Sequence, residues 1–395
     1  MRICYVIARE GVSGGTGTLS FRILSYLHKQ GYHCAYLCCE NNEPITFQLI
    51  EKVVDEIVLG EDKSYLSQFE IISDKYDAYV FLTYSITEYL AIDLIRRKYP
   101  SIVRSFLYVV HYLAFSNAYT DGATLLKNRF RKYFLRFKYR HLLKSLLRNN
   151  TIIFMDEASV SETSKSLNIK IKEDLIYCLP IEVNDYPPDY WNNKSRHTPF
   201  TLGTMCRLEF PFKGYVLGLL KDFILLSQKF DLHLIIVGNG PDENILEQCL
   251  STLPHNVISR IEYIKEVPYS QLDTFYSKCD LVLGMGTVLL DSANHNVLAL
   301  PVKPYSNELL VSDLFLNDIT YLGMKGESVE FDHMLSSLIE LTDSDYFALV
   351  RRQYECFEKV YNIKYFINNL IESDMGALRL RRRERAIFDF VSFWR

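Results

Sequence analysis

Residues 201–215 read TLGTMCRLEFPFKGY, residues 231–244 read DLHLIIVGNGPDEN, and residues 279–305 read CDLVLGMGTVLLDSANHNVLALPVKPY. Each stretch begins with a short apolar run typical of a buried parallel strand and continues into a polar or glycine-bearing turn. A cation pair, two glycine turns and a carboxylate follow these runs in order. Because open α/β sheets bind ligands outside the carboxyl ends of their strands, the arrangement predicts a nucleotide-using enzyme.

Apolar runs alternate with helical patterns along most of the chain. The first series of predicted strands covers 2–8, 33–39, 78–83, 103–110 and 151–155. The second series has predicted strands near 200–205, 232–237, 259–264, 280–283 and 301–303, with helices at 214–229, 242–251, 270–278 and 288–298. This alternation predicts an α/β protein with two parallel, doubly wound, Rossmann-like domains.

A break in the pattern separates the two series. Residues 184–199 read NDYPPDYWNNKSRHTP, which is rich in Pro, Asn and Asp and lacks periodicity, so we expect a linker there. The predicted organisation is an N-terminal domain, a linker, a C-terminal domain, and C-terminal helices with a basic and aromatic tail. Their expected boundaries are 1–185, 186–199, 200–345 and 346–395.

Composition narrows the function classes. The 395 residues carry a formal charge of −4 and are 48% hydrophobic, which suits two ordinary cores and implies no partner. The nine cysteines include no CxxC pair, so we expect reduced thiols and no metal site. No signal peptide or spanning segment is predicted, so we expect a cytoplasmic protein.

The cation pair is Arg207 and Lys213, which flank LEFPF directly after a predicted strand. A diphosphate leaving group gathers negative charge as its bond to a sugar breaks, and two fixed cations stabilise that charge. Gly214 then opens a predicted helix whose first amides add partial positive charge. The alternative is a pair of solvated surface cations.

Two glycine turns follow the next predicted strands. Gly238 and Gly240 follow LHLIIV, and Gly284 and Gly286 follow CDLVL. Glycines let the backbone approach a phosphate or sugar closely. Asp291 lies further along the following helix, where a carboxylate can accept hydrogen bonds from two ribose hydroxyls. Simple connections between strands and helices are the alternative.

Together these elements resemble the C-terminal half of GT-B glycosyltransferases, in particular the large retaining family four. That family shows motifs like GRLxxxKG, VGxGP and EGFGxxxxE, followed by Leu-Pro-Val. The matching stretches here are CRLEFPFKG, VGNGP, LGMGTVLLD and Leu300-Pro301-Val302. The resemblance implies a GT-B fold, with two Rossmann-like domains facing a cleft and a C-terminal helix that crosses back to the first. It also implies a metal-independent reaction without a cofactor, Arg207 and Lys213 on the donor diphosphate, and Asp291 on the donor ribose.

The sequence departs from the family pattern at several positions. Leu283 replaces the first glutamate of the family motif, Asp291 replaces the second, and Cys206 replaces the glycine before the arginine. The Arg–Lys spacing is also one residue longer, and residues 294–296 (NHN) lie in a stretch about three residues longer than usual. We infer that nucleotide binding is retained and that donor-sugar recognition is rebuilt, with Thr287 or residues 294–296 contributing.

The N-terminal half adds two candidate elements. Gly14, Gly15, Thr16 and Gly17 follow the first predicted strand and resemble the family's glycine loop, whose amides approach the donor phosphate or the acceptor. His111 ends the predicted strand SFLYVV, where family members often carry a histidine facing the donor sugar. We expect a positioning role for His111 and no nucleophilic one. A structural turn and an ordinary histidine are the alternatives.

Two basic, aromatic segments indicate a membrane surface. Residues 125–148 contain nine Lys or Arg and no acidic residue, interleaved with aromatic and leucine residues. As a helix this segment suits an anionic bilayer, although its apolar stripe can instead pack on its own domain. Residues 379–395 repeat the pattern, as a second membrane contact or as a tail docking on the N-terminal domain. No motif that reads nucleic acid accompanies either segment.

The sequence therefore predicts a glycosyltransferase that moves a sugar, with retention, from a UDP- or GDP-linked donor to a glycan or lipid-linked acceptor. The N-terminal domain would bind the acceptor and the C-terminal domain the nucleotide sugar. Bacterial capsule, O-antigen or similar surface polysaccharide synthesis, on the inner face of the membrane, is the expected setting. The alternatives are a GT-B-like assembly protein with a degraded donor site and a nucleotide-sugar epimerase.

Overall fold

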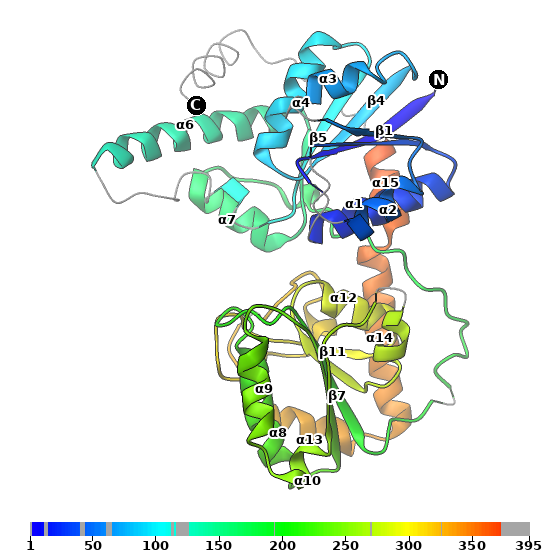
Figure 1. The fold of residues 1–395 in the computed structure, drawn as a ribbon, viewed down its shortest axis with the longest axis vertical. Helices are drawn as coiled ribbons and strands as arrows, with labels where there is room; N and C mark the ends of the chain where they lie inside the picture. The colour runs from blue at the N-terminus through cyan, green and yellow to red at the C-terminus, as the bar shows by residue number, and fades with distance from the viewer. Residues whose placement is uncertain are drawn as a thin grey trace. The chain divides into compact units, whose positions relative to one another are not determined.

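The structure of the protein is a computed structural model, which describes residues 2–11, 15–39, 44–60, 65–111, 114–115, 126–192, 194–268, 271–324 and 326–372. Contacts between residues divide the chain into two compact units. Unit 1 comprises Met1–Glu182 and Ile363–Arg395, and unit 2 comprises Val183–Asn362. Both are α/β units, and Figure 1 colours them by residue number.

Unit 1 contains a six-stranded parallel sheet of order β3-β2-β1-β4-β5-β6. Its strands are β1 (Ile3–Arg9), β2 (His33–Cys38), β3 (Glu56–Leu59), β4 (Ala78–Thr83), β5 (Val103–Val109) and β6 (Ile152–Phe154). Its helices are α1 (Gly15–Lys29), α2 (Pro44–Glu51), α3 (Tyr65–Glu70), α4 (Ile86–Lys98), α6 (Leu126–Arg148), α7 (Glu157–Leu167), η1 (Glu173–Leu175) and α15 (Ile363–Glu372). The central strands are buried on both faces, which explains their unbroken apolar sequences.

Unit 2 contains a five-stranded parallel sheet of order β11-β10-β7-β8-β9. Its strands are β7 (Phe200–Met205), β8 (Leu232–Val237), β9 (Ile261–Ile264), β10 (Leu281–Gly284) and β11 (Leu298–Pro301). Its helices are α8 (Tyr215–Leu226), α9 (Glu243–Ser251), α10 (His255–Ile258), α11 (Leu272–Tyr276), α12 (Thr287–Asn294), η3 (Phe315–Asn317), α13 (Phe331–Glu340) and α14 (Asp343–Tyr361). The two parallel sheets confirm the predicted pair of Rossmann-like domains.

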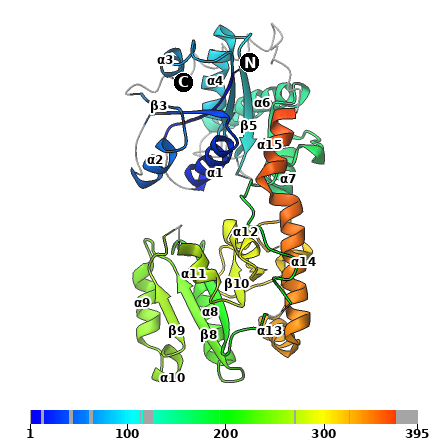
Figure 2. The same cartoon turned by 90° about the vertical axis from the view of Figure 1, so that its right-hand side faces the viewer.

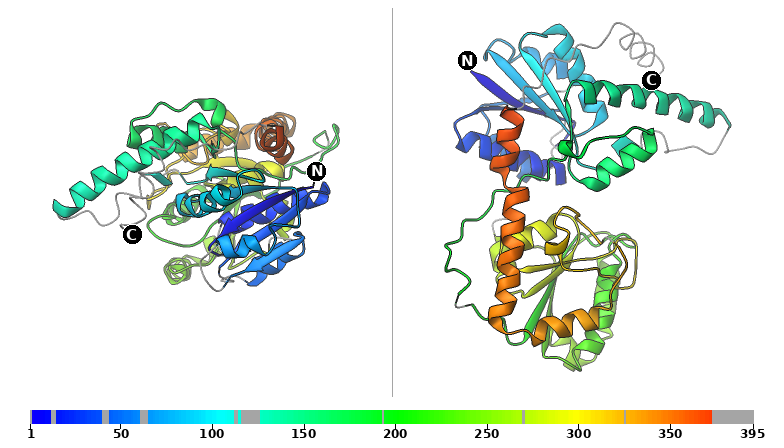
Figure 3. Two further views of the ribbon diagram at one scale, coloured as in Figure 1. Left: turned by 90° about the horizontal axis from the view of Figure 1, so that it is seen from above. Right: turned by 180° about the vertical axis from the view of Figure 1, so that it is seen from behind.

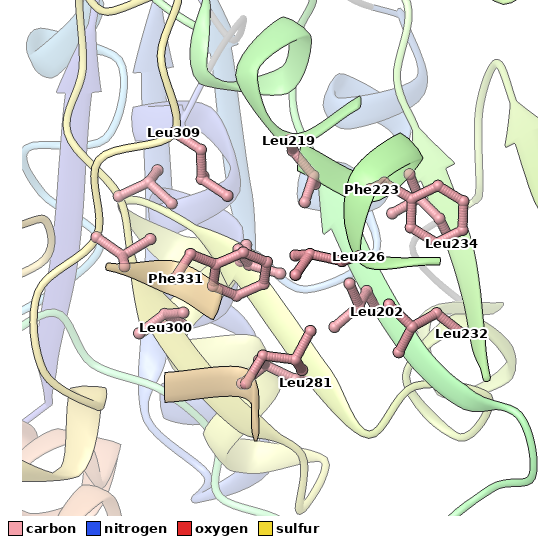
Figure 4. Packing of buried hydrophobic residues seen from close by; sticks show 14 of the residues in the cluster. Leu202, Leu219, Phe223, Leu226, Leu232, Leu234, Leu281, Leu300, Leu309 and Phe331 are labelled. Atoms are coloured by element: carbon pink, nitrogen blue, oxygen red, sulfur yellow. The ribbon is translucent and has the colours of Figure 1, made fainter. Parts of the chain in front are cut away.

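The core of unit 2 forms where α8 covers one face of the sheet (Figure 4). Leu219, Phe223 and Leu226 share a face of α8 because they recur at helical spacing, and all three are buried. They pack in one cluster with Leu202 of β7 and Leu234 of β8. This packing fixes the strands whose carboxyl ends carry the candidate site.

The C-terminal helices belong to different units. Helix α14 packs on α12 within unit 2, and the two run near one another in Figure 2. Helix α15 belongs to unit 1, where the Ile363 N–H donates to the Ile181 carbonyl at 2.8 Å and Phe366 lies 5.3 Å from the Tyr108 ring. The chain thus returns to its first unit, as the family resemblance implied. The expected linker, 186–199, lies within unit 2.

Helix α6 has two dissimilar halves. Its C-terminal half is anchored by Tyr139 and Leu143, which lie in a buried cluster of unit 1. Earlier in the helix, Tyr133, Phe134 and Phe137 are 76%, 40% and 45% exposed. In Figure 3 this end of α6 extends beyond the sheet of unit 1. Packing on its own domain therefore accounts for only part of the apolar stripe.

Two predicted boundaries in unit 2 are wrong. The helix expected over 288–298 ends at Asn294, and the strand expected over 301–303 is β11, which ends at Pro301. Asn296 has a φ of 58°, a left-handed conformation that ends the helix and turns the chain into β11. The predicted set of strands also lacked β3, a short strand at one edge of the unit 1 sheet.

Candidate functional site

The candidate site lies at the carboxyl edge of the unit 2 sheet. The chain proceeds from β7 to β8 and β9 on one side, then crosses to β10 on the other side of β7. The strand order therefore reverses between β7 and β10, the topological switch point at which such sheets bind ligands. Arg207 follows β7, and Gly284, Gly286 and Thr287 follow β10, so both sides of this crevice carry predicted site residues.

The loop after β7 is bonded to the turn after β8. The Leu208 N–H donates to the Asn239 carbonyl at 2.8 Å, and the Asp242 N–H donates to the Leu208 carbonyl at 3.2 Å. The Asp242 carboxylate in turn accepts the Phe210 N–H at 2.6 Å. Asp242 was not among the predicted site residues, and its only sequence signal is its place after GNGP. These bonds give the segment between the two cations a defined conformation.

Gly238 and Gly240 are required for this contact. A Cβ at Gly238 would lie 2.1 Å from the Cys206 carbonyl oxygen, and one at Gly240 would lie 2.3 Å from the Leu208 carbonyl oxygen. No real Cβ tolerates such distances to a backbone atom. The GNGP turn therefore packs its backbone directly on the residues beside Arg207, which is a specific reason for glycine at both positions.

Lys213 and Arg207 occupy different environments in the same loop. The Lys213 side chain is partly buried, with Nζ 4.6 Å from the centre of the Phe212 ring. Burial lowers the pKa of Lys213, opposed by Cys206 and Glu209. The Arg207 side chain is 73% exposed, and its Nε lies 3.8 Å from a Glu209 carboxylate oxygen. The loop thus presents one desolvated cation and one exposed cation.

The helix after Gly214 contributes less than predicted. Helix α8 begins at Tyr215, and the Gly214, Val216 and Leu217 N–H groups all donate to backbone carbonyls of residues 211–214. These amides are already bonded in a turn. Positive charge at this point therefore comes mainly from the side chains of Arg207 and Lys213.

Helix α12 places Asp291 on the same side of the sheet edge. Thr287, Val288 and Asp291 form the partly or fully exposed face of α12, while Leu289 and Leu290 are buried. Thr287 and Asp291 are one turn apart and share that face. Helical side chains lean toward the helix N-terminus, which here is the end beside β10. Both residues thus lie on one partly exposed face of the helix that begins at the carboxyl end of β10.

Residues 294–296 have a different role from the one expected. The Asn294 Oδ1 accepts the Asn184 N–H at 2.9 Å, and the Asn296 Oδ1 accepts the Trp191 indole N–H at 3.0 Å. His295 Nε2 lies 3.0 Å from an Asp273 carboxylate oxygen. The two asparagines lie at the far end of α12 and hold the segment that enters unit 2, whereas His295 contacts α11. Sugar recognition by the two asparagines is therefore not supported.

The predicted residues of unit 1 follow strands of its sheet. Helix α1 already begins at Gly15, so Gly15, Thr16 and Gly17 form its first turn and are not a loop before it. Gly14 lies outside the described residues. His111 follows β5, is exposed, and its backbone carbonyl accepts the Ala114 N–H at 2.9 Å.

A cavity of about 410 Å³ lies at the opposite, amino edge of the unit 2 sheet. Its lining includes Asp280 before β10 and His197 before β7. The Asp280 carboxylate accepts the Thr201 and His197 N–H groups at 2.7 and 3.0 Å, so it holds the start of β7. The lining also carries the Asp273 carboxylate and the basic side chains of Lys194 and His295, and both of its carboxylates are paired with histidines, so it is not a dedicated cationic site for a diphosphate.

Solved structures share this architecture over nearly the whole chain. No protein-family model matches the sequence, and no curated protein matches it. The HepE protein of Anabaena, solved with UDP and glucose, is 12% identical, with a TM-score of 0.57 over 94% of this chain and 98% of its own. A glycosyltransferase from Rickettsia africae is 12% identical, with a TM-score of 0.63 over 98% and 99%. The lipopolysaccharide outer core galactosyltransferase WaaB is 12% identical, with a TM-score of 0.55 over 94% and 99%.

These matches and the two parallel sheets define the fold class. The chain has the GT-B fold, in which two Rossmann-like domains are joined and the last helix returns to the first. The predicted fold class is confirmed. The candidate site lies at the topological switch point of the C-terminal domain, unit 2.

Proposed function

We propose that this chain is a glycosyltransferase that moves a sugar from a UDP- or GDP-linked donor to a glycan or lipid-linked acceptor. The observation that carries the proposal is the switch point of unit 2, where Arg207 and Lys213 follow β7 and Asp291 lies beyond β10. Two cations suit a diphosphate, and a carboxylate suits a ribose diol. The GT-B fold and the UDP bound by HepE support this choice.

Each site residue makes a defined contribution to the proposed reaction. The bond between the anomeric carbon and the β-phosphate oxygen breaks, an acceptor hydroxyl bonds to that carbon, and its proton is released. Lys213 and Arg207 stabilise the charge that develops on the departing diphosphate, each by about 2–4 kcal/mol. In this proposal transfer proceeds with retention, the two cations supply the positive charge, and His111 of unit 1 positions the donor sugar.

A panel of nucleotide sugars tests the proposal. Binding is measured by calorimetry, and turnover is followed by nucleotide release with and without candidate acceptors. We expect one donor to be turned over and the product to keep the donor's anomeric configuration, which NMR reports. Nucleotide binding without turnover would favour an assembly protein, and conversion of the free donor sugar without an acceptor would favour an epimerase.

The proposed site predicts an unusual pH dependence of UDP binding. The nucleotide needs Lys213 as an ammonium ion, so affinity falls as the pH rises through the Lys213 pKa. Because burial holds that pKa below the ordinary lysine value of 10.5, the loss should begin at a lower pH than for an exposed lysine. Calorimetry at increasing alkaline pH measures it. Arginine keeps its charge at alkaline pH, so the UDP affinity of Lys213→Arg should depend less on pH than that of the wild type. The same pH dependence in both proteins would contradict the role of Lys213.

We further propose that α6 attaches the protein to an anionic membrane surface, where a lipid-linked acceptor is displayed. Tyr133, Phe134 and Phe137 are exposed, and Arg136 beside them is also exposed. Peripheral helices bind bilayers by placing aromatic rings at the membrane interface and basic side chains against the lipid headgroups. Within the described residues, no helix is long and apolar enough to cross a bilayer. The second basic segment, 379–395, lies outside the described residues.

Replacing Tyr133, Phe134 and Phe137 together by Ser is expected to weaken binding to vesicles containing phosphatidylserine by at least about tenfold. Co-sedimentation at low and high salt measures both the aromatic and the ionic contribution. Leu225→Ser is the control, because Leu225 is 62% exposed on α8, outside α6. Unchanged binding of the triple variant, or an equal loss in the control, would contradict attachment through α6.

A further inference from the structure

The guanidinium of Arg9 occupies the switch point of the other sheet. Arg9 is the last residue of β1, and β1 lies between β2 and β4. The chain runs from β1 to β2 and β3 on one side and then crosses to β4 on the other. The strand order of unit 1 therefore reverses between β1 and β4, at the place where α/β sheets bind ligands. No sequence pattern marks Arg9 as a site residue, since one arginine at a strand end is ordinary.

Two of the three guanidinium nitrogens lack hydrogen-bond partners within the described part of the chain, while the Tyr36 hydroxyl contacts the group. Its Nε and Nη1 atoms are buried, and neither has a hydrogen-bond partner there. Buried polar groups are nearly always hydrogen-bonded, and leaving a charged one unsatisfied is costly. Such a group is expected where a ligand completes the bonding.

The side chains around Arg9 come from three different elements. Tyr36 of β2 is fully buried, and its hydroxyl donates to the Gly11 carbonyl at 3.3 Å. Tyr84 follows β4, and its hydroxyl lies 3.5 Å from the Ser20 Oγ. Burial keeps the pKa of both phenols above the ordinary value, so both are neutral hydrogen-bonding groups.

Glu88 is the carboxyl group that belongs to this cluster. Its Oε2 accepts the Tyr84 and Ser85 N–H groups at 3.3 and 3.1 Å, in the capping box that begins α4. Burial raises the pKa of Glu88, and the positive charge of Arg9 acts in the opposite direction. Glu88 is thus committed to the helix start, and the Nε and Nη1 donors of Arg9 remain available to another acceptor.

We propose that Arg9 binds an oxyanion, a phosphate or a carboxylate, carried by the acceptor substrate. A guanidinium presents its donors in a planar fork that matches two oxygens of either group. The inference rests on the proposed function, in which Arg207 and Lys213 of unit 2 hold the donor's diphosphate. A second anion site at the unit 1 switch point then binds the other substrate, the acceptor.

The test titrates the full-length protein with inorganic phosphate and with glucuronate, in saturating UDP so that the unit 2 site is filled. Ligand-detected NMR gives affinities for the wild type and for Arg9→Gln. We expect the variant to lose at least about tenfold in affinity for one anion while its UDP affinity changes less than about twofold. Loss for phosphate alone identifies a phosphate-bearing acceptor, and loss for glucuronate alone a carboxylate-bearing one.

Two further variants keep the result interpretable. Arg104→Gln makes the same charge change at an exposed position of β5 and should leave anion affinity unchanged. Arg9→Met removes the unsatisfied charge, so its unfolding temperature should not rise on adding the anion, whereas that of the wild type should. Anion binding that survives in Arg9→Gln, no saturable binding in the wild type, or weakened UDP binding in Arg9→Gln would overturn the proposal. Absence of donor turnover in the wild type would instead refute the proposed function, because the anion titration does not depend on turnover.

Discussion

Lys213→Ala is expected to lower the rate of sugar transfer by about 30- to 1000-fold, and Arg207→Ala by a similar factor. Each substitution removes about 2–4 kcal/mol of stabilisation of the charge on the departing diphosphate. The loss should appear in kcat as well as in kcat/KM, since that charge develops during bond cleavage. Steady-state kinetics with the donor found in the nucleotide-sugar panel measures both quantities.

A charge-matched control separates this effect from a change of net charge. Lys221→Ala removes one positive charge from the exposed face of α8, the helix that follows the loop carrying Arg207 and Lys213. This variant should leave the rate of sugar transfer unchanged. If Lys213→Ala and Arg207→Ala both transfer or hydrolyse donor at the normal rate, the role assigned to the pair is wrong. If only Arg207→Ala is normal, the partly buried Lys213 alone carries the stabilisation.

Gly238→Ala should abolish nucleotide binding and destabilise unit 2. Its Cβ would lie 2.1 Å from the Cys206 carbonyl oxygen, so the backbone next to Arg207 has to move. Forced backbone shifts in packed regions typically cost about 1–3 kcal/mol, occasionally more. Calorimetry with UDP and thermal unfolding measure the two effects, and we expect both in the same variant.

Gly323→Ala is the matched control in the same unit. The nearest atom to its Cβ would be the Tyr321 Cε1 at 3.7 Å, an ordinary contact, so affinity and unfolding temperature should both stay near the wild-type values. A Gly238→Ala protein that binds UDP normally would show that the conformation of the loop carrying Arg207 and Lys213 does not determine nucleotide binding.

The strands were predictable because burial on both faces of a parallel sheet demands unbroken apolar sequence. Runs such as LHLIIV and CDLVLG leave few alternatives, and the residues after them necessarily meet at one edge. The close approach of Gly238 and Gly240 to the neighbouring loop also follows from their position. The predicted site residues of unit 2 therefore follow three neighbouring strands, β10, β7 and β8, at one edge of the sheet.

The end of α12 was not predictable, because it depends on tertiary contacts. The sequence SANHN is compatible with a helix, yet Asn294 and Asn296 bond to residues 184 and 191, over a hundred positions earlier. The same holds for Asp242, whose bond to the Phe210 N–H joins two loops, and for Arg9, whose significance appears only once strand order and burial are known.

The most direct test of the account is a crystal structure of the full-length protein bound to UDP. We predict the diphosphate against Lys213 and Arg207, beside the Gly238 turn, with the ribose hydroxyls on Asp291. UDP bound instead in the 410 Å³ cavity at the amino edge of the sheet, or a nucleotide that touches none of these three side chains, would contradict the central claim.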